Sequence, residues 1–148
     1  KTMNLLSRDN GRTPMQWDAS ENSGFSIVKP WLPVHKNHKT VNVEAQEKDA
    51  NSVLNHFKKM VSIRKENLIL VYGKYTLIQK EHETIYAYTR SLGEEKMLVL
   101  LNFSEKKSSI SIPSLSKNPK VLINNYKRLT IAKNSIELAP YQAVIIKL

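Results

Sequence analysis

The chain has 148 residues, of which 41% are hydrophobic and 24% charged, a globular composition that excludes wholesale disorder. It has no cysteine, so disulfide scaffolds, thiol nucleophiles, iron–sulfur clusters and cysteine-ligated zinc are excluded. Its longest apolar runs span five residues, whereas a membrane helix needs about 20. The first ten residues lack the apolar stretch of a signal peptide. We therefore expect a cytoplasmic protein with no membrane partner.

The net charge of +10 raises the question of nucleic-acid binding. The excess is spread evenly, with 11 basic and 7 acidic residues in 1–68 and 12 and 6 in 69–148. Of the 23 basic residues 18 are Lys, whereas base and phosphate recognition favours the forked donors of Arg. A nucleic-acid partner is therefore not expected.

Residues 1–50 show little periodicity and carry the turn-forming residues Gly11, Pro14, Gly24, Pro30 and Pro33. Fifty residues without regular structure are improbable inside a compact domain. This texture indicates functional loops or a missing structural context.

One helix is predicted from about Ser52 to Asn67. Val53, Phe57 and Met60 recur on one face at helical spacing, and Asp49 to Ser52 supply residues that cap a helix.

From about Leu70 the hydrophobic period changes to two, which predicts strands. Gly93-Glu94 is expected to form a hairpin turn, and the strand after it is apolar on both faces and therefore central. The predicted strands span residues 71–79, 85–92, 97–103, 107–113, 121–124, about 129–131, and 143–148. Short strands at this spacing indicate an antiparallel sandwich, so the chain is mainly β.

Few side chains suggest catalysis or metal binding. His35 and His38 share an H-x-x-H spacing but lie in a proline-bounded loop without a third ligand, so surface histidines are favoured. The acidic pairs lie in predicted turns or before the helix, and none resembles a buried catalytic dyad. No cofactor and no metal are expected. The glycosylation pattern Asn102-Phe103-Ser104 falls at the end of the central strand and is interpreted as unused.

One segment is dense in polar side chains. Residues 7–18 read Ser-Arg-Asp-Asn-Gly-Arg-Thr-Pro-Met-Gln-Trp-Asp. Guanidinium groups hold sugar hydroxyls and carboxylates with fixed geometry, and Trp offers an apolar platform for a sugar ring. The structural alternative is a hydrogen-bonded loop stiffened by Pro14, with Met15 and Trp17 buried.

This segment resembles the signature late in the catalytic barrel of oligo-1,6-glucosidases and related α-glucosidases of the α-amylase superfamily (glycoside hydrolase family 13). The resemblance covers nearly the whole chain and weakens after about Lys106. Further similar segments are Asn22-Ser23-Gly24-Phe25, Lys29-Pro30-Trp31-Leu32, Arg64-Lys65-Glu66-Asn67, Val71-Tyr72-Gly73, residues 85–90 and residues 98–104.

The resemblance implies a fold and a domain boundary. Residues 1–68 would be the end of a (β/α)₈ barrel, namely the loop after its eighth strand and its last helix. Residues 69–148 would be a C-terminal Greek-key β-sandwich. The family's catalytic carboxylates lie upstream, and no position of this chain matches them. The chain alone is therefore expected to be inactive, and the missing N-terminal barrel would be its partner.

The residue that the resemblance does carry over is Arg12. In the family the arginine before Thr-Pro lines the glucose subsite at the cleaved bond, touching sugar hydroxyls and an upstream aspartate. Its place on a loop after a barrel strand agrees with where barrel active sites lie. Arg8 and Asp9 would shape the same loop.

The implied parent is a retaining α-glucosidase that hydrolyses short gluco-oligosaccharides with α-1,6 or other α linkages. One alternative is the same region of a trehalose-6-phosphate hydrolase, which shares the motifs. A second is a free-standing carbohydrate-binding β-sandwich, although Trp17 and Trp31 both lie outside the predicted strands.

Overall fold

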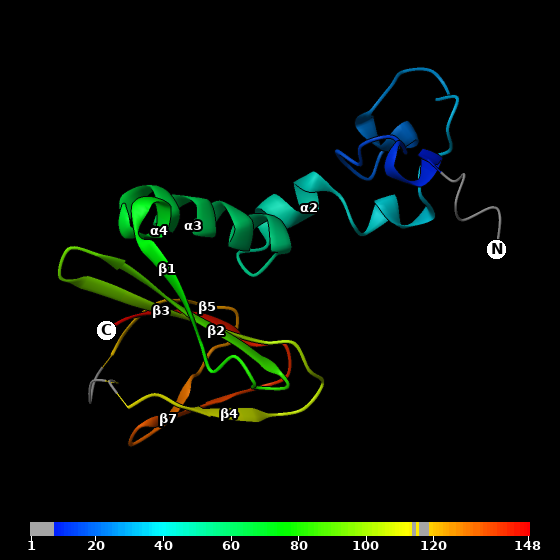
Figure 1. The fold of residues 1–148 in the computed structure, drawn as a ribbon. Coiled ribbons are helices and arrows are strands. Elements are labelled where there is room, and N and C mark those ends of the chain that lie inside the picture. The colour runs from blue at the N-terminus through cyan, green and yellow to red at the C-terminus, as the bar shows by residue number, and fades with distance from the viewer. Residues whose placement is uncertain (1–7, 114, 116–118) are drawn as a thin grey trace. The chain divides into compact units, whose positions relative to one another are not determined.

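The computed structural model describes residues 8–113, 115 and 119–148 (Figure 1). The chain divides into two compact units, Lys1–Lys59 and Met60–Leu148. The division falls inside helix α3 (Val53–Glu66). The resemblance implies a boundary between two domains of a larger enzyme, at residues 68 and 69. The division into compact units does not test that boundary, which stays a prediction. Among the described residues, none of the helices has the length and apolarity needed to span a bilayer.

The first unit is built from short helical turns joined by irregular backbone. Its elements are the 3₁₀ turns η1 (Arg8–Gly11), η2 (Glu21–Gly24) and η3 (Lys36–Lys39), helix α2 (Val43–Lys48) and the start of α3. The sequence analysis did not predict α2. Asn42 begins it, because its side-chain oxygen accepts a hydrogen bond from the amide of Ala45 at 2.8 Å.

The predicted helix at 52–67 is confirmed as α3, which spans Val53–Glu66. Ser52 caps it by accepting a hydrogen bond from the amide of Asn55 at 3.1 Å. No residue of α3 is buried, and the side chains of Val53 and Phe57 are 81% and 62% exposed. The apolar face that the spacing predicts is therefore present but not covered by the described residues.

The predicted strand at 71–79 is wrong at its start. Residues Ile69–Tyr72 form the single-turn helix α4, and the strand β1 begins only at Lys74 and ends at Ile78. Ile69 and Leu70 are buried with Met97 in a small apolar cluster. A short apolar run fits one helical turn as well as a strand, so its periodicity cannot separate the two.

The second unit holds two antiparallel sheets. The larger has the order β1-β2-β3-β8-β5, and the smaller has the order β4-β7-β6. The remaining strands are β2 (Ile85–Leu92), β3 (Glu95–Asn102), β4 (Ser108–Ser111), β5 (Lys120–Asn124), β6 (Thr130–Ala132), β7 (Ser135–Leu138) and β8 (Ala143–Lys147). The mainly β fold with an antiparallel sandwich is confirmed, and β3 is central because β2 and β8 pair with its two edges.

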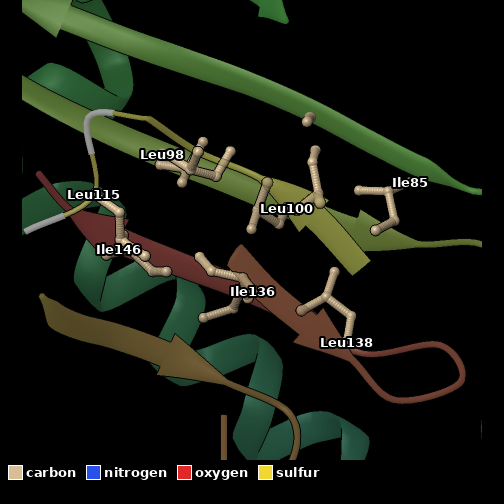
Figure 2. Close-up of a cluster of buried hydrophobic side chains, with 11 residues drawn as sticks. Ile85, Leu98, Leu100, Leu115, Ile136, Leu138 and Ile146 are labelled. Atoms are coloured by element: carbon tan, nitrogen blue, oxygen red, sulfur yellow. The ribbon is translucent and has the colours of Figure 1, made fainter. Parts of the chain in front are cut away.

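The core lies between the two sheets (Figure 2). Leu98, Leu100 and Ile146 of the larger sheet meet Ile136 and Leu138 of the smaller one, and all five are fully buried. Ile136 and Leu138 belong to β7, a strand that the sequence analysis missed although apolar and polar residues alternate along it.

The glycosylation pattern falls at the end of β3, where Asn102 has a structural role. Asn102 is buried, and its side-chain amide donates hydrogen bonds of 2.8 Å to the carbonyls of Lys106 and Ala139. Its Oδ1 accepts from the amide of Ser104 at 3.0 Å. The Asn102 amide is therefore a structural group that ties two loops of the sandwich together, β3–β4 and β7–β8, and it is buried in the folded state.

Candidate functional site

The segment that carries Arg12 begins in η1. The amide of Arg12 donates to the carbonyl of Asp9 at 2.9 Å, which closes this turn. The Arg12 side chain is exposed and makes no hydrogen bond or ion pair with any residue that the structure describes. Asp9 is also exposed, whereas the side chain of Arg8 lies outside the described part of the chain. The structure thus brings Arg12 and Asp9 together on one turn and leaves the Arg12 guanidinium open to a ligand.

The next residues are held firmly by α2. A helix leaves its first amides without partners inside the helix. Here the amides of Val43 and Glu44 donate to the carbonyls of Gln16 and Trp17, each at 2.9 Å. The side-chain amide of Gln16 donates to the carbonyl of Val41, and the adjoining Pro14 is buried. The start of α2 therefore anchors the motif at Gln16 and Trp17, a few residues after Arg12.

A left-handed turn holds the other side of the motif. Asn22, Ser23 and Gly24 have φ values of 53°, 59° and 63° in succession, a conformation that is costly for residues other than glycine. The carbonyl of Ser23 accepts hydrogen bonds from the amides of Trp17 at 2.9 Å and Asp18 at 3.3 Å. The strained turn is thus fastened to the motif through backbone hydrogen bonds.

Asp18 ends the motif as a charged group. Its Oδ1 accepts a hydrogen bond from the amide of Ser20 at 2.8 Å and a second from the Ser20 hydroxyl. These two hydrogen bonds, aided by the nearby His38, lower the pKa of Asp18 below its ordinary value. The carboxylate therefore stays ionised, and it stabilises the loop through its hydrogen bonds with Ser20.

A cavity of about 520 Å³ lies in the same unit. Its described lining includes Glu21, Asn22, Lys29, His38 and Lys39. Glu21 is the one carboxylate among the lining residues that the structure describes. Retaining glycoside hydrolysis needs two carboxyl groups about 5 Å apart, so this cavity does not by itself form a catalytic dyad.

The structure separates the two interpretations of the motif residue by residue. Gln16 and Asp18 make the hydrogen bonds of a structural loop, as that alternative expects, and Pro14 is buried. Met15 and Trp17, which the same alternative places inside, are 49% and 50% exposed. Gln16 and Asp18 therefore stabilise the backbone of the loop, whereas Met15, Trp17 and Arg12 are exposed.

The histidines contribute to local structure. The Nδ1 of His38 donates to the carbonyl of His35 at 3.1 Å, and the Nδ1 of His35 contacts Oδ1 of Asn37. Within the described ranges, no three His, Asp or Glu side chains are grouped in a way that could hold a metal ion.

Sequence reasoning did not select the residues that support the motif. Ser23 in η2 and Asn37 in η3 bind the motif directly, and Asn42 caps α2, whose first amides bind the motif. The only local signals are the turn-forming Asn-Ser-Gly and an Asn in a capping position, and neither shows which distant backbone groups are bound.

Two known families match the chain in order along the sequence. Residues 1–73 match the family described as "Alpha amylase, catalytic domain", and residues 85–145 match the "Alpha-amylase SusG C-terminal domain". The second match falls on the sandwich, from the first residue of β2 into β8.

Individual relatives extend over almost all of the chain. The oligo-1,6-glucosidase of Parageobacillus thermoglucosidasius is 44% identical over 95% of this chain and 26% of the relative. The structure of Bacillus licheniformis trehalose-6-phosphate hydrolase superposes with a TM-score of 0.86 at 38% identity, again over 95% of this chain and 26% of that protein. A MutB variant in complex with sucrose gives the same TM-score, identity and coverages.

The chain spans about a quarter of the length of the relatives that it matches. These relatives are glycoside hydrolases by name, and their similarity runs through both the motif loop and the sandwich. The chain belongs to the alpha-amylase family, glycoside hydrolase family 13.

Proposed function

We propose that this chain is the C-terminal part of a retaining α-glucosidase that hydrolyses short gluco-oligosaccharides with α-1,6 or other α linkages. Support comes from relatives named oligo-1,6-glucosidase and from a similar protein whose structure was solved with its substrate sucrose. In such an enzyme a carboxylate nucleophile forms a glucosyl intermediate, and a second carboxyl group protonates the departing sugar. Both carboxyl groups would come from polypeptide upstream of Lys1.

The observation that carries the proposal is the contrast within the motif. Gln16 and Trp17 are fastened to α2 through their carbonyls, whereas the Arg12 guanidinium, a few residues earlier, is exposed and unpaired among the described residues. An anchored loop that presents one free planar cation is suited to hold sugar hydroxyls and a carboxylate at the same time. We assign to Arg12 this binding role at the glucose subsite, with Asp9 and Arg8 shaping the turn.

The uncovered apolar face of α3 supports the placement of the chain within a larger protein. Val53 and Phe57 lie on this face and are largely exposed. The last helix of a (β/α)₈ barrel would bury such a face against the rest of the barrel.

A trehalose-6-phosphate hydrolase is the second candidate. The superposition on the Bacillus licheniformis enzyme of that name favours it. Comparison of kcat/KM for isomaltose and for trehalose 6-phosphate in the enzyme-length protein decides between the α-glucosidase and the trehalose-6-phosphate hydrolase. Only the hydrolase is expected to have a higher kcat/KM for the phosphorylated substrate.

The test of the proposal has two stages. The purified 148-residue chain is expected not to hydrolyse p-nitrophenyl α-glucoside, because it places no pair of carboxylates in a cleft among its described residues. In the enzyme-length protein, Arg12→Ala is expected to lower kcat/KM by about two orders of magnitude. The substitution would leave the upstream aspartate, a partly buried carboxylate, without the arginine that pairs with it in the family.

Two further variants give the controls. Arg12→Lys should recover only part of the activity, because Lys keeps the charge but lacks the planar fork. Lys58→Ala removes an exposed cation that pairs with Glu47 at 3.0 Å and should leave kcat/KM unchanged. Normal kcat/KM in a folded Arg12→Ala enzyme, or turnover by the isolated chain, would contradict the proposal.

A further inference from the structure

Two arginines from different elements converge on the single-turn helix α4. Arg64, in the last part of α3, donates through Nη1 to the carbonyl of Leu70. Arg90, in β2, donates through Nη2 to the same carbonyl at 3.5 Å and to the carbonyl of Val71 at 3.0 Å. Its Nε reaches the carbonyl of Ile69 at 3.4 Å. Because both guanidinium groups bind one oxygen atom, they lie within a few ångströms of each other.

These two positive charges have no carboxylate partner among the residues that the structure describes. Helix positions three and four residues from Arg64 hold Met60, Val61, Asn67 and Leu68, none of which is acidic. Directly across the sheet from Arg90 lie Tyr75 and Met97.

Glu95, two residues along β3 from Met97, is already engaged by Lys147. Among the described residues, the charges of the arginine pair are therefore balanced only by the partial charges of backbone carbonyls, while like charges at this separation repel.

The donors that remain free have a definite geometry. A guanidinium has five N–H donors, and its Nε–H and Nη2–H point in parallel along one edge. Arg90 uses that edge on the α4 carbonyls. Arg64 uses only Nη1, so its Nε and Nη2 edge has no partner among the described residues, and the residue is exposed to solvent. Two parallel donors beside a second positive charge match the two oxygens of a carboxylate.

We propose that Arg64 and Arg90 form a carboxylate-binding site at α4, in which Arg64 binds the carboxylate with two parallel hydrogen bonds and Arg90 supplies the second charge. The site lies in the second unit and uses none of the residues assigned to the sugar subsite, so it does not depend on the proposed function. The carboxylate can come from a dissolved ion or from an Asp or Glu side chain of a second copy of this chain.

The test follows the Nε–Hε signals of the five arginines of the 148-residue chain by NMR. Sodium acetate replaces sodium chloride at constant ionic strength. A saturable shift of the Arg64 signal is expected, accompanied by Arg90 and not by Arg128. A dilution series without acetate separates the two sources: an Arg64 shift that depends on protein concentration assigns the carboxylate to a second copy.

Variants decide whether the pair is the site. Arg64→Gln should abolish the acetate-dependent shift, now followed at Arg90, and Arg64→Lys should weaken acetate binding at least tenfold because the parallel edge is lost. Arg64 makes a single hydrogen bond and is exposed, so both variants are expected to fold. Arg90→Lys should weaken binding less than Arg64→Gln does. Arg128→Gln removes the same charge from an exposed arginine elsewhere in this unit and should leave binding unchanged.

Three results would overturn the proposal. One is that neither acetate nor protein concentration shifts the Arg64 signal beyond what chloride does. The second is that Arg64→Lys binds acetate as tightly as the unaltered chain. The third is that Arg128→Gln weakens binding as much as Arg64→Gln, since the effect would then be one of net charge.

Discussion

The carboxylate of Asp18 lies directly against the backbone of Gly24. A methyl group built on Gly24 would lie 2.5 Å from Oδ2 of Asp18 and 2.9 Å from its Cγ. The carboxylate has little freedom to move away, because Oδ1 is held by the amide and the hydroxyl of Ser20. The motif loop thus depends on a residue without a side chain at position 24, where φ is also +63°.

Gly24→Ala is therefore expected to lower the free energy of unfolding of the first unit by about 2–3 kcal/mol, from the left-handed φ together with the contact with Asp18. Both tryptophans lie in this unit, so urea unfolding followed by Trp fluorescence reports the change. Gly93→Ala is the matched control, because Gly93 has φ +57° but, apart from its own chain neighbours, no described residue would lie within 4 Å of the added methyl group. It should cost about 1 kcal/mol, measured by circular dichroism. Equal losses in the two variants would show that the contact with Asp18 has no energetic effect.

Ser23→Ala is expected to stabilise the first unit by about 1 kcal/mol. The Ser23 side chain is fully buried, and its hydroxyl has no hydrogen-bond partner among the described residues, so its desolvation is uncompensated. Alanine has the same backbone strain at this φ, so the variant changes only the hydroxyl. Ser20→Ala should have the opposite sign, because that hydroxyl donates to Asp18. Urea unfolding by Trp fluorescence measures both, and a less stable Ser23→Ala chain would contradict the prediction.

The sandwich should lose stability between about pH 10 and 12. The hydrogen bond between the Tyr75 and Tyr86 hydroxyls raises the pKa of Tyr75 from 10.0 to about 12. The folded state then retains a proton that the unfolded chain releases, so this contribution is complete below pH 10 and disappears as pH rises through 12. Tyrosinate absorbance should show Tyr86→Phe returning the pKa of Tyr75 toward 10. Tyr72→Phe, at a largely exposed position, should not change it.

Amide exchange should be slowest in β3 and fast in β6. β3 is paired on both edges, and Leu98 and Leu100 are fully buried. β6 is a three-residue strand at the edge of the smaller sheet. Protection follows burial and pairing, so hydrogen exchange resolved by NMR tests the topology. Unprotected amides at 97–102 beside protected amides at 130–132 would exclude β3 as the central strand.

The sequence alone predicted the elements whose patterns are long or sharply bounded. Helical spacing from Val53 to Met60 located α3, and strict alternation before Gly93 located β2 and its hairpin with β3. The motif at residues 7–18 indicated the family and singled out Arg12. Such signals survive because each is contained within one continuous segment and needs no distant contact for its interpretation.

Tertiary structure decided the features that depend on distant partners. Ile69–Tyr72 is helical because Ile69 and Leu70 pack with Met97, and no local pattern in that apolar run selects a helix over a strand. Arg64 and Arg90 are separated by 26 positions and meet only because both bind the carbonyls of α4. Likewise, one part of the motif is anchored whereas Arg12 is exposed. The first amides of α2 have no acceptor inside the helix, and only the tertiary structure brings the carbonyls of Gln16 and Trp17 within reach of them.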